Sequence, residues 1–246
     1  MTKALSFFCI LLLPVMSWAY FIPSNLTSTE QKFVAGFLSQ TYSAQYMSRP
    51  FYTGNDLGIE FGTSFQYRPL DQVKERFTAD DINSSLFLSS LYINKSLIYG
   101  LELGLSMLLS SFTSDTVSGF GGHLRWYPDI FANRKFQAVL QLYTQYTNFR
   151  DAFYNQDLGF HMGLGYNRRD FSVYLGGDFA FAFSSFSAIS DARPITSSGR
   201  REEVDHANFS PFLSLQYHFD SFHINVIQSY NFNASWSSRL NLSYSL

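Results

Sequence analysis

The chain has 246 residues, of which 15% are charged and 19% are aromatic, and its formal net charge is −2. Charged residues make up roughly a quarter of an ordinary soluble domain, so this composition has too little charge to cover a water-exposed surface. The basic residues are scattered along the chain, which excludes the basic stripe of a nucleic-acid-binding protein.

Residues 1–19 have the features of a secretory signal peptide. Lys3 forms a short basic region, residues 4–15 are apolar, and the small residue Ala19 precedes the expected cleavage site. Cleavage there would remove Cys9, the only cysteine. The mature chain is therefore predicted to contain no disulfide and no cysteine-ligated metal, although it leaves the cytoplasm.

Residues 20–55 are predicted to form an N-terminal periplasmic segment with a short helix. Ser28 is placed to act as the N-cap, and Gln31 three residues later completes a capping box. One face of this helix would carry Phe33, Phe37, Leu38 and Thr41, which stand at helical spacing. We expect the helix to lie against or inside the mouth of the domain that follows, as a plug. An eleventh strand segment or a loose tail are the alternatives.

Residues 56–246 contain about ten segments in which apolar and polar residues alternate, each with the length of a tilted membrane-spanning strand. Two segments repeat a motif, GIEFG at residues 58–62 and GLELG at residues 100–104, in which glycines leave room beside a glutamate on the polar face. The segment at residues 86–93 is apolar on both faces, so its register stays open. After the signal peptide, no apolar run approaches the roughly 20 residues of a membrane helix.

Two turns provide an independent check on the alternation. Phe219 pairs with Phe222 if the two residues between them form a hairpin loop. Tyr166 pairs with Phe171 if residues 167–170 form a four-residue loop. Each pairing joins residues that the alternation already assigns to the apolar face, and a slip of one residue would have reversed a whole strand.

Longer polar stretches are predicted as loops at residues 68–83, 148–156 and 184–207. Bacterial membrane barrels have an even number of strands, short turns at the periplasmic end and longer loops at the outer end. Both ends of the mature chain are therefore expected on the short-turn, periplasmic side.

The composition of the polar face indicates which face meets water. A soluble lipocalin-like barrel also alternates, but a water-exposed sheet would carry Lys and Glu. The polar face here consists mainly of Gly, Ser, Gln and Asn, so we predict that the apolar face lies in lipid and that the sheet closes to pair its backbone groups. The lumen is predicted to hold a charge network of Glu60, Glu102, His123, Arg125, His161, Asp178 and Arg239.

Aromatic residues gather near the ends of the predicted strands. Membrane barrels carry aromatic girdles at both interfaces with water. The predicted girdle includes Trp126, Tyr127, Tyr166, Tyr230, Trp236 and Tyr244.

The last segment, SRLNLSYSL at residues 238–246, alternates apolar and polar residues to the end of the chain. With the signal peptide and the cysteine-free mature chain, it resembles Gram-negative outer-membrane β-barrel proteins, whose last strand usually ends in an aromatic residue. Leu246 departs from that pattern. The resemblance covers residues 56–246 and implies an all-β, closed antiparallel transmembrane β-barrel of about ten strands in the outer membrane. It also implies outer-membrane lipids and the barrel assembly machinery as partners.

Two passive functions fit these features. A narrow pore for small solutes would use the charged lumen residues as a selectivity filter. A structural or surface-displaying barrel would use the same residues as salt bridges that fill a small interior. We predict one of these two roles, with no catalytic residue, no metal and no cofactor.

An outer-membrane enzyme, either a lipid deacylase or a rim protease, is the alternative function. His161, His218 and His223 have serines on adjacent faces, and the stretch GRREEVDHAN at residues 199–208 carries carboxylates and a histidine. Serine is abundant throughout the chain, so such neighbours are expected by chance. The five histidines show no HxxxH or HxH spacing that would indicate a metal site.

Overall fold

The computed structural model describes residues 23–42, 58–77, 85–109, 117–128, 135–149, 152–168, 170–190, 193–231 and 236–246. The predicted signal peptide lies outside these residues. Within them, no helix is both long enough and apolar enough to cross a membrane.

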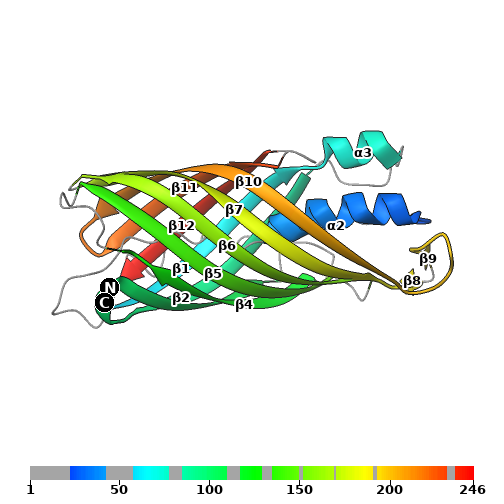
Figure 1. Cartoon of the computed structure of the whole chain (residues 1–246), viewed down its shortest axis with the longest axis horizontal. Helices are drawn as coiled ribbons and strands as arrows, with labels where there is room; N and C mark the ends of the chain where they lie inside the picture. Colours follow the sequence, from blue (N-terminus) through cyan, green and yellow to red (C-terminus); the bar gives the residue numbers. More distant parts are fainter. Residues whose placement is uncertain are drawn as a thin grey trace, which may run out of the picture.

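Ten strands of the described chain close into an antiparallel barrel (Figure 1), as the alternation predicted. The strands are β1 (Ile59–Pro69), β2 (Ser85–Ser96), β3 (Leu101–Leu109), β4 (Val117–Trp126), β5 (Phe136–Phe149), β6 (Phe153–Asn167), β7 (Phe171–Phe186), β10 (Glu202–Phe219), β11 (Phe222–Tyr230) and β12 (Trp236–Ser245). The last strand, β12, pairs with β1 and closes the sheet. A small hairpin of β8 (Ile189–Ser190) and β9 (Arg193–Pro194) lies in the β7–β10 connection.

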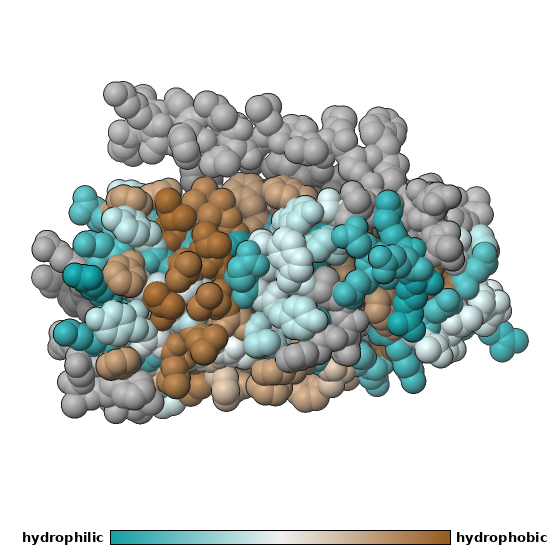
Figure 2. Space-filling view, turned by 90° about the horizontal axis from the view of Figure 1, so that it is seen from above, coloured by the Kyte–Doolittle hydropathy of each residue, from teal (hydrophilic) through white to brown (hydrophobic). Residues whose placement is uncertain are grey.

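The apolar face of the sheet points outward and the polar face points inward. On β3, for example, Leu105 is 61% exposed whereas the adjacent Ser106 is 7% exposed. Apolar side chains form a belt across the wall, and hydrophilic side chains gather toward both ends (Figure 2). A closed antiparallel barrel with an apolar outer belt and a polar interior is the architecture of small outer-membrane β-barrels.

The two ends of the barrel differ. The connections β2–β3, β4–β5, β6–β7 and β10–β11 lie at one end, here called the short-turn end, together with the C-terminus (Figure 1). The first of them includes a 3₁₀ turn, η1 (Ile98–Gly100). The remaining connections lie at the opposite end, called the long-loop end; the β1–β2 connection contains helix α3 (Asp71–Phe77).

The register at the short-turn end confirms one predicted turn and corrects the other. Phe219 pairs with Phe222 across a two-residue hairpin loop, as predicted. Tyr166 pairs with Val173 and not with Phe171. The correction is a shift of two residues, which leaves every side chain on its predicted face because the strand period is two.

Four neighbouring strands extend further than the others toward the long-loop end. They are β5, β6, β7 and β10, with 14, 15, 16 and 18 residues, and we call them the tall wall. Two predicted long loops are therefore wrong in extent. Of the predicted loop at residues 148–156, only residues 150–152 separate β5 from β6, and residues 202–207 of the predicted loop at residues 184–207 belong to β10. Antiparallel strands can be polar on a solvated face, so polar composition alone did not mark the end of pairing.

Helix α2 (Ser28–Tyr42) lies in the long-loop mouth and contacts the tall wall (Figure 1). Its residues Val34 and Phe37 belong to a buried apolar cluster with Leu86, Leu88 and Phe153 from the inner faces of the strands. The sequence predicted a helix at a barrel mouth but expected it at the short-turn end. The structure places it at the opposite end, because there the inward residues are apolar and can cover the helix.

This arrangement also explains why the segment at residues 86–93 is apolar on both faces. Phe87 and Leu91 are exposed on the outer wall, whereas Leu86 and Leu88 are buried and face the helix cluster. The register of β2, which the sequence left open, therefore follows from the position of α2.

The helix uses a capping box one residue earlier than predicted. The Thr27 amide donates to Glu30 Oε2 at 2.8 Å, and the Glu30 amide donates to Thr27 Oγ1 at 3.4 Å. Hydrogen bonds from the Thr27 hydroxyl and amide lower the pKa of Glu30. The predicted pair has other roles, since Ser28 is exposed and the buried Gln31 donates to the Leu26 carbonyl at 3.1 Å.

Glycines on the inner face leave room for rings from the neighbouring strands. A Cβ atom added to Gly62 would lie 2.1 Å from Tyr92 Cζ, and one added to Gly104 would lie 2.1 Å from His123 Cε1. The glycines beside the two glutamates therefore make space for these rings, and not only for the carboxylates as the sequence suggested.

We expect Gly159→Ala to lower the free energy of unfolding by about 1–3 kcal/mol. The added methyl group would lie 2.0 Å from Tyr143 Cζ and would displace the ring, whose hydroxyl donates to Asp178 Oδ2 at 3.1 Å. Urea unfolding of the barrel in detergent micelles measures the loss. Gly122→Ala is the matched control, because the atom nearest to its added Cβ is 3.6 Å away. Equal stability of the two variants would contradict this packing.

Candidate functional site

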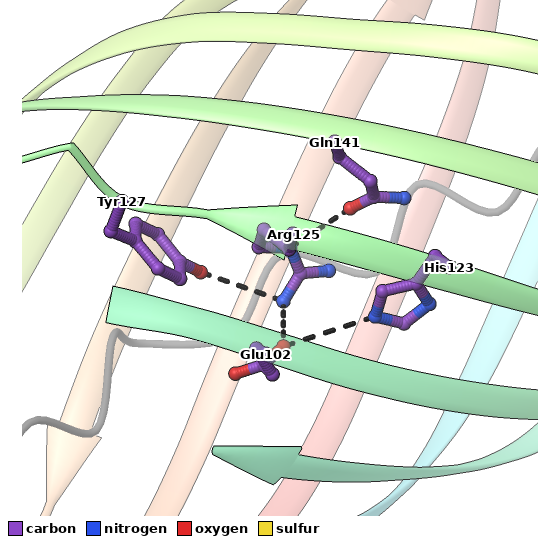
Figure 3. Close-up of polar contacts among 5 residues, drawn as sticks. All are labelled: Glu102, His123, Arg125, Tyr127 and Gln141. Atoms are coloured by element: carbon purple, nitrogen blue, oxygen red, sulfur yellow. Dashed lines mark hydrogen bonds and ion pairs between the residues drawn. The ribbon is translucent and has the colours of Figure 1, made fainter. Parts of the chain in front are cut away.

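An ion pair between two neighbouring strands forms the centre of the polar interior near the short-turn end. Glu102 on β3 lies directly opposite Arg125 on β4, and Arg125 Nη1 donates to Glu102 Oε1 at 2.5 Å. Arg125 also donates from Nε to Gln141 Oε1 at 2.8 Å and from Nη1 to the Tyr127 hydroxyl at 3.5 Å. The Nε2 atom of His123 lies 3.8 Å from the same Glu102 oxygen (Figure 3).

These side chains are almost completely removed from solvent. Arg125 is 0% exposed, Glu102 is 2% exposed and His123 is 3% exposed. A buried charge is costly unless a counter-charge and hydrogen bonds compensate it, and the carboxylate, the amide oxygen and the phenol hydroxyl around Arg125 do so. The network therefore joins β3, β4 and β5 across the interior.

The other predicted lumen residues are also buried on the inner face. His161 Nδ1 lies 3.8 Å from Asp178 Oδ1, and the His161 ring stacks on Phe212 with centroids 4.2 Å apart. Arg239 Nη2 donates to Gln66 Oε1 at 2.7 Å. The structure thus brings Glu102, His123 and Arg125 into contact, and it places His161 beside Asp178. Glu60 and Arg239 lie on the inner faces of β1 and β12.

The predicted aromatic girdle requires one correction. Five of its members are exposed on the outer wall, with exposed fractions between 38% and 50%: Trp126, Tyr166, Tyr230, Trp236 and Tyr244. Tyr127 is instead 7% exposed and contacts Arg125. It directly follows the outward-facing Trp126, and successive side chains of a strand point to opposite faces.

Arg68 is a buried cation that the sequence analysis assigned to a loop. It lies inside the long-loop mouth with 1% exposure. Its Nη1 donates to the Phe37 carbonyl at 2.7 Å, and its guanidinium lies 4.0 Å from the centroid of the Phe37 ring. The inward parity that Arg68 shares with Gln66 was the signal that could have identified it.

The histidines named for the enzyme alternative lie in different surroundings. His218 and His223 are buried near the short-turn end, where His218 Nε2 is 3.1 Å from Ser172 Oγ and His223 Nε2 is 2.7 Å from Ser245 Oγ. The Nδ1 atoms of the two histidines are 3.2 Å apart. His161 contacts Asp178 instead.

The acidic stretch at residues 199–208 lies at the long-loop end. Much of it is the first half of β10, so the predicted loop is a strand in this part. Glu202 accepts a hydrogen bond from Ser198, and His206 Nε2 lies 2.7 Å from Asn208 Oδ1. For the enzyme alternative, this stretch supplies Glu202, Glu203, Asp205 and His206.

Comparisons with known proteins give weak similarities. No protein-family model matches the chain, and no curated protein matches it. Among solved structures, the KdgM porin in complex with disordered oligogalacturonate is 12% identical, with a TM-score of 0.38, over 76% of this chain and 98% of that chain. The attachment invasion locus protein Ail of Yersinia pestis is 10% identical, with a TM-score of 0.33, over 76% and 95%.

The outer membrane protease OmpT from Escherichia coli is 12% identical, with a TM-score of 0.41, over 83% of this chain and 100% of that chain. The three proteins are a porin, an attachment protein and a protease by name. At these identities and TM-scores, no function is transferred to this chain.

Proposed function

We propose that this protein is an integral outer-membrane barrel with a structural or surface-displaying role, and that its filled interior does not conduct solutes. The apolar belt supports insertion in lipid. The closure of the sheet supports it as well, because a closed barrel satisfies its backbone hydrogen bonds internally. By the usual topology of such barrels, the short-turn end faces the periplasm and the long-loop end faces outward.

The observation that carries this proposal is the burial of polar side chains at successive positions along the barrel axis, here called levels. Near the short-turn end, Arg125 and Gln141 are 0% and 1% exposed. Further along the barrel, Asp178 is 0% exposed, and Asp157, closer to the long-loop end, is also 0% exposed. Side chains that line a water-filled pore remain accessible to water, so these levels support a packed interior of the kind expected for small barrels.

Helix α2 adds a further obstruction at the long-loop end. Arg68 on β1, Asn208 on β10 and Asn231 after β11 all donate to backbone carbonyls of the helix, at Phe37 and Gly36, over 2.7, 3.0 and 3.4 Å. The helix also packs against β6 and β7, so contacts from several strands hold it within the mouth. The tall wall and the β8–β9 hairpin rise beside this plug and form the surface that we propose is displayed.

The test is conductance in planar lipid bilayers. We expect no discrete conductance steps from the full protein after insertion, which heat-dependent mobility in SDS gels and protection from protease would verify independently. The Phe37→Ala variant, which loosens the plug, is expected to stay silent as well, because the packed levels below the helix remain. Reproducible steps that change size on Glu102→Gln would contradict the proposal and would support the pore.

The proposal includes no catalytic role. The Ser245 and His223 contact at 2.7 Å is the specific observation that favours the enzyme alternative, since a serine nucleophile needs a base within hydrogen-bond reach. His218 lies in the position that the orienting group of a triad would occupy. Labelling of Ser245 by a serine-reactive fluorophosphonate would decide for that alternative.

A further inference from the structure

The two histidines at the short-turn end lie directly opposite each other across the β10–β11 hairpin turn. His218 on β10 pairs with His223 on β11, and both side chains point inward, with exposed fractions of 6% and 4%. The sequence separation of five residues did not match a common metal-binding spacing, so the sequence analysis predicted no metal site. Antiparallel pairing across a two-residue turn brings the two rings together.

The rings are held with the same atom of each facing the other. The Nδ1 atoms are 3.2 Å apart, and the ring planes meet at 69°. On the far side of each ring, Nε2 lies within hydrogen-bond distance of a serine hydroxyl, at 3.1 Å for Ser172 and 2.7 Å for Ser245. The contacts therefore fix the orientation of both imidazoles.

The serine contacts limit which nitrogen of each histidine carries the proton. A histidine that ligates a metal through one nitrogen commonly donates its other N–H to an oxygen, which fixes the tautomer. If both Nε2 atoms donate to their serines, both Nδ1 atoms carry lone pairs that point toward each other. Two lone pairs at this distance repel unless a proton or a metal ion lies between them. The proton can be the Nδ1–H of one histidine, whose Nε2 then accepts from its serine hydroxyl.

The separation of the Nδ1 atoms fits a metal ion. Metal–imidazole bonds of about 2.0–2.1 Å place two ligand nitrogens about 3.4 Å apart at a tetrahedral ion and about 2.9 Å apart at neighbouring corners of a square-planar ion. The observed 3.2 Å lies between these values. Imidazole suits both Zn²⁺ and Cu²⁺, and Cu²⁺ binds more tightly to a given nitrogen site.

We propose that His218 and His223 form a two-histidine binding site for a divalent transition-metal ion, Cu²⁺ or Zn²⁺, at the short-turn end of the barrel. The two Nδ1 atoms bind the ion, and Ser172 and Ser245 orient the rings from the other side. The remaining coordination positions are taken by water or by solute ligands that reach the site from the short-turn end. The half-buried Ser245 lies at that end.

The experiment is a Cu²⁺ titration of the full mature protein, folded in detergent and carrying no polyhistidine tag, followed by electron paramagnetic resonance. We expect one bound Cu²⁺ per chain with hyperfine coupling to two nitrogens. His218→Gln and His223→Gln should each weaken binding by at least about tenfold, and Ser245→Ala should weaken it by about tenfold through loss of ring orientation. Acidification should release the ion, because protons compete for the imidazoles.

His206→Gln is the matched control, since His206 lies on the same strand at the long-loop end; it should leave the affinity unchanged. Circular dichroism and gel mobility would verify that each variant is folded. Two results would overturn the proposal. One is the absence of Cu²⁺ binding to folded protein at millimolar concentration, which would leave a shared proton between the rings. The other is binding that both histidine variants retain at full strength.

Discussion

Glu102→Leu is expected to lower the free energy of unfolding by about 3–5 kcal/mol, because it removes the carboxylate from a buried ion pair and leaves a buried cation. Arg125 is 0% exposed and donates to Glu102 at 2.5 Å. Gln141 and Tyr127 still accept from the guanidinium, but neither carries a full negative charge. The loss can be measured by urea unfolding in detergent micelles, with far-ultraviolet circular dichroism as the signal.

Two further variants test whether the loss of stability comes from the buried charge or would follow from any substitution in the barrel. The double variant Glu102→Leu, Arg125→Met should be more stable than the single variant, because replacing both charges removes the desolvation cost. Glu203→Gln, at an exposed position on β10, should change stability by less than about 0.5 kcal/mol. A single variant as stable as the wild type would mean that water reaches Arg125, and the packed interior would then be wrong.

Phe37→Ala is expected to weaken the docking of α2 by about 3–5 kcal/mol, the range for truncating a buried phenylalanine. The Phe37 ring is 1% exposed, belongs to the apolar cluster of the long-loop mouth and lies beneath the Arg68 guanidinium at 4.0 Å. Its loss removes the apolar contact and the aromatic face for the cation together. A loss of this size should release the helix locally while the strands stay folded.

Hydrogen exchange of the amides in α2, read by mass spectrometry, measures this release directly. We expect the helix amides to exchange much faster in the variant, with little change in the β-strands, because local opening of an element need not involve global unfolding. Lys32→Ala changes an exposed residue of the same helix and should leave the exchange unchanged. Protection of α2 equal to that of the wild type would show that the mouth cluster does not hold the helix.

The strand pattern could be predicted because its cause is local. Side chains alternate between the two faces along each strand, so period two assigned Leu105 and Arg125 to opposite faces. The Gly, Ser, Gln and Asn content of the polar face then placed Arg125 inward and Leu105 outward. The pairing of Phe219 with Phe222 followed from the length of the turn between them. Every residue of the predicted lumen network was found on the inner face for the same reason.

The features that sequence reasoning missed depend on contacts between distant parts of the chain. The position of α2 depends on apolar inward residues such as Leu88 and Phe153, which meet only when the barrel closes. The ion pair within the lumen depends on register, which sets Glu102 opposite Arg125. The His218 and His223 contact depends on strand pairing and not on a sequence motif.

Photolabelling from within the bilayer identifies the face of the sheet that lies in lipid. The protein would be reconstituted with a phospholipid that carries a diazirine in its acyl chain, illuminated, and mapped by mass spectrometry. We expect labels on outward side chains such as Leu105, Phe181 and Leu215, and none on Ser106, Gln141 or Asp178. Labels on the inward residues, or an equal spread over both faces, would show that the apolar face does not lie in lipid.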